Sequence, residues 1–247
     1  MLKKSCTAGS GKRMNDPNLD QLIAAAGLLR PLLDELVFVG GCVTGLLITD
    51  AAAGAPRATF DVDAIAEITS YAAYADFGDR LRALGFGEDT SEDAPLCRWT
   101  HHRTILDVMP LNEKILGFAN RWYKAAMESS VTIRLKADLE IRAVTAPYFI
   151  ATKLEAFKGR GKGDFFGSHD LEDLVAVVDG RETLAAEIRA ELVELRAYIQ
   201  AEAKSLLATA GFLDALPGYL LPDAASQSRI GIVLNRLEDL ASIRERS

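Results

Sequence analysis

The sequence predicts an α/β or α+β sheet domain, with helices interleaved among its strands, followed by a segment that is helical throughout. Strand-like patterns are confined to residues 36–145, where they alternate with stretches of helical spacing. From Pro147 onward the apolar residues recur only at helical spacing. We therefore expect a flexible tail over residues 1–18, a sheet domain over 19–145 and a helical domain over 146–247.

The first predicted elements are a helix, a strand and a second helix. Apolar residues recur at helical spacing over 19–36, with Asn18 as the expected N-cap and Pro31 as the expected interruption. LVFVGG at 36–41 predicts a short buried strand that ends in two glycines. Residues 42–50 resume helical spacing.

The rest of the sheet domain is expected to contain one strand, one helix and two hairpins. TFDVDAIAEI at 59–68 has the alternation of a strand, and residues 71–86 form an amphipathic pattern that Gly85 closes. Strand pairs around short polar turns are predicted over 96–110 and 130–144.

Four helices are predicted in the C-terminal part. The first covers 147–160, and the second begins after Ser168 as its N-cap. One long helix is expected over 181–208 and a last one over 226–246.

Composition excludes several classes of function. A net charge of −7 and a pI of about 5.1 argue against general nucleic-acid binding, so contact with phosphates would need a local basic patch. Three cysteines without CxxC spacing and three histidines argue against a zinc site and fit a reducing cytoplasm. No apolar run approaches the ~20 residues of a membrane span, so we expect a cytoplasmic protein without a membrane partner.

Asp61 and Asp63 are the first candidate functional residues. They alternate with Phe60 and Val62, so both carboxylates are expected on one face of a strand. Carboxylates this close repel each other unless a cation lies between them, which makes the pair a candidate metal site. The alternative is an exposed sheet face on which both acids are solvated.

Two further features have simple structural alternatives when each is taken alone. Gly40 and Gly41 would let a ligand approach the backbone, and the N-terminus of the next helix would offer N–H groups to an anion. The alternative is that the two glycines only form a tight turn. Asp107, in the apolar run TILDVMP, would add a third carboxylate if its strand lay beside the first, or it is an acid at a strand end.

Together these features resemble the DNA polymerase β-like nucleotidyltransferases, in which a glycine pair, a DxD pair and a later lone Asp occur in this order. Within that superfamily the chain resembles the AbiEii toxin family. The resemblance spans residues 36–180 and rests on VGG at 39–41, TFDVD at 59–63, ILDVMP at 105–110, ATKLEAF at 151–157 and HDLEDL at 169–174.

The resemblance implies a fold, an activity and a set of site residues. The fold would be a polymerase-β-like mixed sheet. The activity would be magnesium-dependent transfer of NMP from an NTP to a hydroxyl group, here on RNA at the 3′ end of tRNA, by a toxin that an antitoxin protein counteracts. The implied catalytic residues and ligands of two Mg²⁺ ions are Asp61, Asp63 and Asp107. The implied nucleotide-binding residues are Gly40, Gly41, Thr44, Lys153 and Asp170. Cys42 stands where such proteins often have Ser or Thr, so Thr44 is expected to supply that hydroxyl.

Two other functions stay open on the sequence. The same chemistry could act on a small hydroxylated molecule such as an antibiotic, or the chain could be a non-catalytic module that binds NTP or RNA. The basic stretch KLEAFKGRGKG at 153–163 is the best candidate for meeting a triphosphate or an RNA end, and its alternative is a solvated loop.

Overall fold

The computed structural model describes residues 16–117, 119–161 and 163–243, and these form two compact units. Unit 1 takes the described residues up to Val43 together with Ala58–Thr145. Unit 2 takes Thr44–Arg57 and the described residues from Ala146 onward. Most of the tail expected over 1–18 lies outside the described residues.

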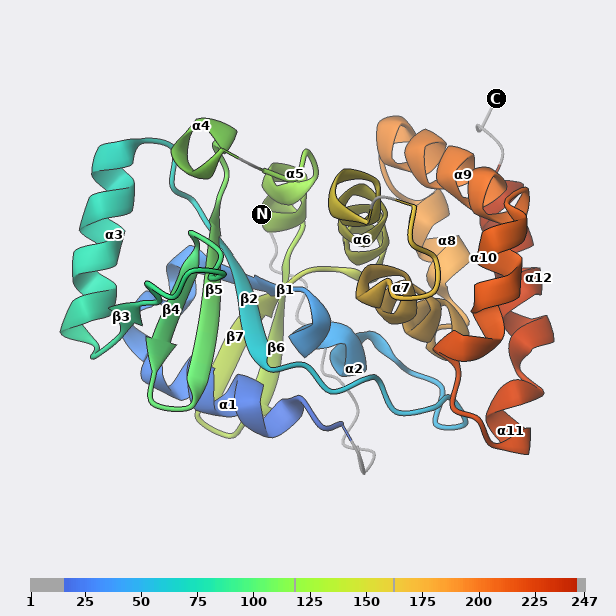
Figure 1. Ribbon diagram of the computed structural model, residues 1–247, viewed down its shortest axis with the longest axis horizontal. Coiled ribbons are helices and arrows are strands. Elements are labelled where there is room, and N and C mark those ends of the chain that lie inside the picture. Colours follow the sequence, from blue (N-terminus) through green and yellow to red (C-terminus); the bar gives the residue numbers. More distant parts are fainter. Residues whose placement is uncertain (1–15, 118, 162, 244–247) are drawn as a thin grey trace. The chain divides into compact units, whose positions relative to one another are not determined.

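Unit 1 contains the mixed sheet that the sequence predicts (Figure 1). In its described part, seven strands run in the order β3-β4-β5-β2-β1-β7-β6. Neighbours are parallel at β2–β5 and β1–β7 and antiparallel elsewhere. The strands are β1 (Leu36–Val39), β2 (Asp61–Ala66), β3 (Gly87–Glu88), β4 (Arg98–His101), β5 (Thr104–Pro110), β6 (Val131–Lys136) and β7 (Leu139–Ala143). Both predicted hairpins, β4–β5 and β6–β7, are therefore confirmed.

Helices flank this sheet. The helical elements of unit 1 are α1 (Leu19–Leu28), the 3₁₀ helices η1 (Arg30–Glu35) and η2 (Gly41–Val43), α3 (Tyr71–Ala83), α4 (Glu113–Leu116) and α5 (Tyr123–Glu128). Pro31 stands in the first turn of η1, so the predicted interruption is confirmed. Helix α1 packs against β2, β5 and β7, and α3 packs against the buried Trp99 of β4.

Asn18 precedes α1, as expected, but its side chain does not cap the helix. Its Oδ1 accepts a hydrogen bond from the Thr59 backbone N–H at 2.9 Å, and its Nδ2 donates to the Gly41 carbonyl at 3.4 Å. The residue is fully buried, so these polar groups need partners. Asn18 thus ties the approach to β2 to the turn after β1.

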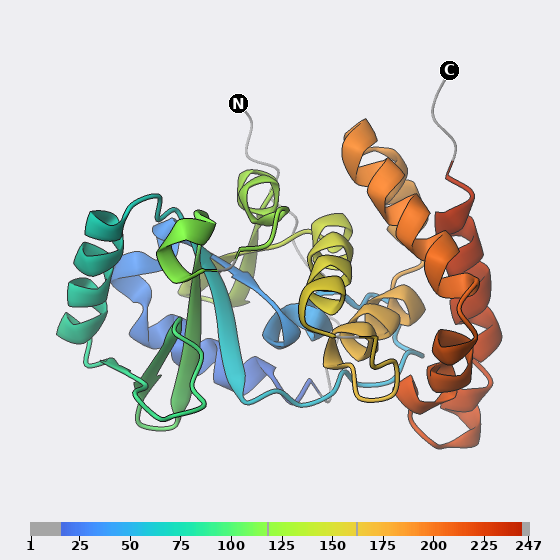
Figure 2. The same ribbon diagram turned by 45° about the horizontal axis from the view of Figure 1, so that its top comes forward.

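Unit 2 is helical in its described part. Its elements are α2 (Thr44–Leu47), α6 (Ala146–Arg160), α7 (His169–Gly180), α8 (Leu184–Arg189), α9 (Val193–Leu207), α10 (Ala210–Ala215), the 3₁₀ helix η3 (Leu216–Tyr219), α11 (Ala224–Gln227) and α12 (Ile230–Ala241). Helices α9 and α12 pack along each other, as Figures 1 and 2 show from two directions. Ser168 caps α7 by accepting from the Leu171 N–H, as predicted.

The single long helix predicted over 181–208 is wrong. The chain breaks between α8 and α9, where Leu192 is extended (φ −58°, ψ 147°) and 71% exposed. A straight helix of that length would reach ~42 Å. The break instead lets α8 and α9 both pack against α6. Burial of the apolar faces of these two helices therefore outweighs the local preference for one continuous helix.

The segment 44–57 joins the helical unit, although the sequence places it within the sheet domain. The backbone N–H groups of Thr49 and Asp50 both donate to the carbonyl of Gly180, at 2.8 and 2.9 Å. Arg229 of unit 2 also forms an ion pair with Asp50 at 2.6 Å. These contacts are distant in sequence, so local patterns do not reveal them. The longer part of the helical unit begins at Ala146.

Within the described residues no helix combines the length and the apolar composition needed to cross a bilayer. The long helices α6 and α9 have 15 residues each, whereas a span needs ~20.

Gly180 offers a test of the packing between α7 and the 44–57 segment. A Cβ at this position would lie 2.6 Å from Cγ2 of Ile48, so we expect Gly180→Ala to lower the free energy of unfolding by about 1–3 kcal/mol through overpacking. Gly159→Ala in α6 is the matched control, because no atom in the described part of the chain lies within 4 Å of the Cβ it would add. That variant should gain about 0.5–1 kcal/mol. Chemical denaturation measures both, and equal effects would contradict the packing described.

Candidate active site

A row of charged residues crosses the sheet of unit 1. On β2, Asp63 lies directly opposite Asp107 of β5, and Asp107 lies directly opposite Arg98 of β4. Directly opposed residues in a sheet point to the same face, and Asp61 shares that face because it is two residues from Asp63. The sheet register therefore gathers three carboxylates and one guanidinium on one face.

Arg98 pairs with two of these carboxylates. Its Nε and Nη2 donate to the two oxygens of Asp107, at 2.8 and 2.7 Å, and Nη2 also donates to Oδ2 of Asp61 at 3.1 Å. The Asp107 side chain is 8% exposed and that of Arg98 is 21% exposed. Hydrogen bonding to Asp107 raises the pKa of Arg98 further above its already high value. Removing one partner from a buried pair typically costs about 3–5 kcal/mol, so this contact is a strong constraint.

The negative charge of the carboxylates affects the pKa of the neighbouring residue, Cys97. Burial raises the pKa of this thiol to about 12, and the carboxylates of Asp107 and Asp63 raise it as well. The thiol is therefore protonated at neutral pH and is a poor nucleophile. Cys97 is therefore a buried neighbour of the carboxylates and not a candidate nucleophile.

The carboxylates fit a divalent cation by donor type, since Mg²⁺ prefers carboxylate oxygens. The Nη2 atom of Arg98 acts as a stand-in cation, because it lies between Oδ2 of Asp61 and Oδ2 of Asp107. In the arrangement described, however, no group of three or more His, Cys, Asp or Glu residues among the described residues is placed to hold a metal ion. The chemistry of the donors fits a cation, and Arg98 already pairs with two of the three carboxylates.

Thr59 fixes the remaining oxygen of Asp61. Its Oγ1 donates to Oδ1 of Asp61 at 2.6 Å, while its backbone N–H is held by Asn18. Both oxygens of Asp61 therefore accept hydrogen bonds, one from Thr59 and one from Arg98. This orients the carboxylate before any ligand arrives.

Gly40 makes room for Asp63. Val39 lies directly opposite Asp63, so the next residue turns past that side chain. Gly40 has φ +69°, and a Cβ at this position would lie 1.9 Å from Oδ2 of Asp63. Only glycine satisfies both the backbone angle and the space.

The segment after the glycine pair is less regular than expected. Gly41 begins a 3₁₀ turn, and the following helix α2 has only four residues, so a helix dipole contributes little. Cys42 is buried, and its thiol donates to the Val39 carbonyl. The Thr44 hydroxyl is buried and, within the described part of the chain, has no hydrogen-bond partner.

Lys153 and Asp170 meet within unit 2, in a buried charge network. The Lys153 ammonium donates to Asp170 at 3.2 Å and to Asp173 at 2.6 Å, and its side chain is 7% exposed. Arg160 makes two further bonds to Asp170, and Arg57 makes two to Asp173. Lys153 is thus engaged by two carboxylates.

Opposing effects act on the pKa of Asp170. Burial raises it, but hydrogen bonds and charge from Arg160 and Lys153 outweigh burial and leave the pKa below its usual range. The carboxylate is therefore ionised at neutral pH, and its stabilising contribution is lost only as the pH falls through that lowered pKa.

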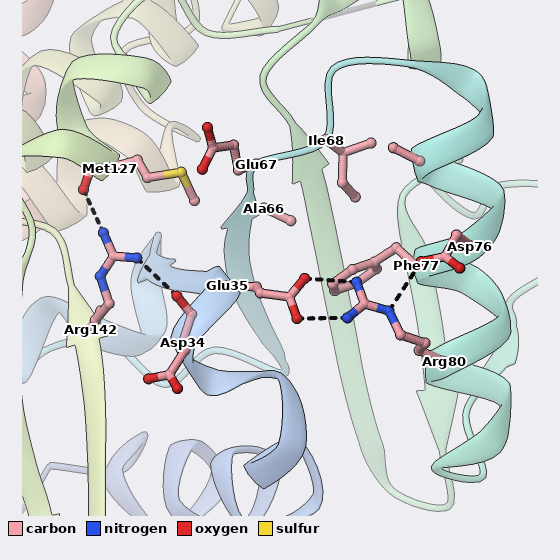
Figure 3. Close-up of a pocket in the computed structure, with 11 residues that line it drawn as sticks. Asp34, Glu35, Ala66, Glu67, Ile68, Asp76, Phe77, Arg80, Met127 and Arg142 are labelled. Atoms are coloured by element: carbon pink, nitrogen blue, oxygen red, sulfur yellow. Dashed lines mark hydrogen bonds and ion pairs between the residues drawn. The ribbon is translucent and has the colours of Figure 1, made fainter.

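A cavity of unit 1 lies at the other end of the central strands. It has a volume of about 290 Å³ and is lined near Ala66, the residue opposite Leu36 at the start of β1 (Figure 3). Arg80 donates two hydrogen bonds to the carboxylate of Glu35 and also pairs with Asp76. Arg142 donates to the backbone carbonyls of Asp34 and Met127. Both arginines are engaged, so the cavity is poorly suited to a triphosphate.

Arg98 and Asp173 are not among the residues predicted from the sequence, although the sequence contains a signal for each. The turn of the β4–β5 hairpin, His102–Arg103, has two residues, and that length alone sets Arg98 opposite Asp107. Asp173 follows Asp170 by three residues, which places both on one face of α7.

Comparisons with known proteins give only distant matches. No protein-family model matches the chain, and no curated protein matches it. Two solved structures from Helicobacter pylori are similar in fold. Protein JHP933 has 12% identity and a TM-score of 0.47, covering 92% of this chain and 93% of its own. A proposed nucleotidyltransferase has 10% identity and a TM-score of 0.48, with coverages of 92% and 96%. Similarity at this level does not indicate a shared activity.

Gly40 permits a test of how tightly the cluster is built. We expect Gly40→Ala to destabilise the protein by about 1–2 kcal/mol through backbone strain and by about 1–3 kcal/mol more through the clash with Asp63. Gly117→Ala shares the positive φ (+78°), but its Cβ would meet none of the described residues within 4 Å, so it should show only the strain. Equal destabilisation in urea titrations would contradict the close approach of Asp63 to the turn.

Lys153 permits a similar test in unit 2. Lys153→Met leaves two buried carboxylates without their shared ammonium, so we expect a loss of about 3–5 kcal/mol in the free energy of unfolding. Lys158→Met, in the same helix, removes a half-exposed pair with Glu202 and should cost less than about 1 kcal/mol. If both variants unfold at the same denaturant concentration, the buried network contributes nothing specific.

Proposed function

We propose that the protein is a nucleotidyltransferase that moves a nucleoside monophosphate from a nucleoside triphosphate to a hydroxyl group. The observation that carries this proposal is the convergence of Asp61, Asp63 and Asp107 on one sheet face, beside the glycine turn at Gly40. Holding like charges together costs stability, and such arrangements are typical of functional sites.

In this reaction the acceptor oxygen attacks the α-phosphorus and forms a new P–O bond. The bond from that phosphorus to pyrophosphate breaks, and the hydroxyl proton passes to a base or to water. Charge builds up on the phosphoryl oxygens, so catalysis depends chiefly on positioning and electrostatic stabilisation.

The reaction would depend on magnesium bound at the carboxylate cluster. Asp61 and Asp63 would hold the ion, which would neutralise charge on the phosphate oxygens, and Asp107 is the third carboxylate of the cluster. Thr59 and Arg98 orient Asp61 for this purpose. Gly40 and Gly41 would let the triphosphate approach the backbone. Thr44, Lys153 and Asp170 stay predictions as nucleotide-binding residues.

For the acceptor we propose RNA, specifically the 3′ end of tRNA, and for the biological role a cytoplasmic toxin controlled by an antitoxin. What supports this is the resemblance of the motifs and the basic end of α6. There the side chains of Lys158 and Arg160 are 50% and 74% exposed, so part of each remains accessible to an RNA phosphate in this acidic chain.

One observation favours a second candidate, a non-catalytic module that binds NTP or RNA. Arg98 occupies a position between Asp61 and Asp107 that a cation would take in a catalytic site. In this second function the arginine would make the cluster a purely structural ion pair. The two functions differ in whether divalent cations alter NTP binding.

The proposed activity is tested by incubating the protein with Mg²⁺, each labelled NTP and a tRNA pool. We expect label to enter tRNA, and Asp61→Ala or Asp63→Ala to lower the rate by about 100-fold or more, because each removes a ligand of the charge-stabilising ion. Asp93→Ala, the same change on an exposed loop, is the control. Binding of NTP that is unaffected by Mg²⁺, with no labelling by any NTP, would instead support the non-catalytic module.

A further inference from the structure

We infer that the guanidinium of Arg98 takes the place of one divalent cation in the carboxylate cluster, so that the chain binds one such ion there instead of two. This inference refines the metal site of the proposed function. It revises the expectation of two ions that the family resemblance implies.

The first reason is the position of the guanidinium. Its Nη2 lies 3.1 Å from Oδ2 of Asp61 and 2.7 Å from Oδ2 of Asp107, so a single cationic group bridges carboxylates from two strands. Bridging of carboxylates from neighbouring strands is what a bound divalent cation would otherwise do in this cluster.

The second reason is charge. Asp61, Asp63 and Asp107 bring three negative charges to one face of adjacent strands, and Arg98 supplies one positive charge that no change of pH within the stable range removes. This fixed positive charge lowers the need of the carboxylates for further cations, so it favours one divalent ion over two.

The third reason is that the guanidinium is hard to displace. It makes two bonds to Asp107 and one to Asp61, and the Asp107 carboxylate is nearly buried. Its planar fork matches a carboxylate with two parallel bonds, which an ammonium or a hydrated ion does not reproduce. Mg²⁺ gives up its water reluctantly, so it competes poorly for a carboxylate held this way.

The arrangement divides the cluster into two parts. Asp107 acts as a positioning residue, because both of its oxygens accept from Arg98 and its side chain is only 8% exposed, whereas that of Asp61 is 31% exposed. Asp61 and Asp63 would hold the ion, and Thr59 and Gly40 constrain the positions of their carboxylates. Asp107 is then neither a ligand of the ion nor the base that takes the acceptor proton.

The experiment counts bound Mn²⁺ ions per chain by titration, with free Mn²⁺ followed by electron paramagnetic resonance. We expect one ion on the wild-type protein and two on Arg98→Ala, because that change releases Asp107 and one oxygen of Asp61. Arg103→Ala, in the exposed turn of the same hairpin, should keep one ion. Mn²⁺ should also raise the melting temperature of Arg98→Ala more than that of the wild type, because the added ion replaces the lost charge.

The outcomes separate this inference from the proposed function. Two ions on the wild type, or no additional ion on Arg98→Ala, would overturn the inference while leaving nucleotidyl transfer possible. No ion on the wild type would overturn the inference as well, and it would also count against magnesium-dependent transfer by the natural chain.

A second pair of variants covers the case in which Arg98→Ala does not fold. Asp107→Asn should leave the wild-type count at one, because the inference gives that carboxylate no part in ion binding. Asp63→Asn should reduce the count to zero. Loss of the ion in Asp107→Asn would show that Asp107 is a ligand and would overturn the inference.

Discussion

The pairing of Arg98 with Asp107 and Asp61 is the interaction on which the candidate site depends. The parallel register of β2 and β5 places Asp63 directly beside Asp107, and the alternation of β2 adds Asp61 on the same face. Carboxylates in such a row repel one another, and a sheet cannot relieve that repulsion without losing its register. A cation from the next strand, at the position opposite Asp107, offsets the repulsion within the same row.

In unit 2 too, a pair of buried carboxylates is stabilised by a cation from a neighbouring helix. Asp170 and Asp173 lie on one face of α7 and are almost fully buried, and Lys153 of α6 bridges them. Arg57 and Arg160 complete the hydrogen bonding at the two carboxylates. In both units a buried acidic pair is acceptable only because a neighbouring element supplies a cation that satisfies its oxygens.

This requirement bears on function because a cation that stabilises the fold also limits what the carboxylates can bind. An arginine cannot be deprotonated and holds a fixed geometry, so Asp107 is committed to it. Asp63 is shaped differently, by the absence of a side chain at Gly40. The cluster is therefore asymmetric: one side is closed by a guanidinium, and the other is bounded by a glycine turn.

The sequence by itself determined β1 and β2, the two hairpins, the helices α1, α3, α6 and α7, and the alternation that places Asp61 and Asp63 on one face. These follow from local rules, since the periods of helix and strand and the chemistry of turns act over a few residues. Only the tertiary structure decided that residues 44–57 join the helical unit, that the helix predicted over 181–208 breaks, and that β2 lies beside β5, so that Arg98 also meets Asp61. Each of these depends on which distant surface a segment buries or which distant charge it meets, and such contacts leave no period in the chain.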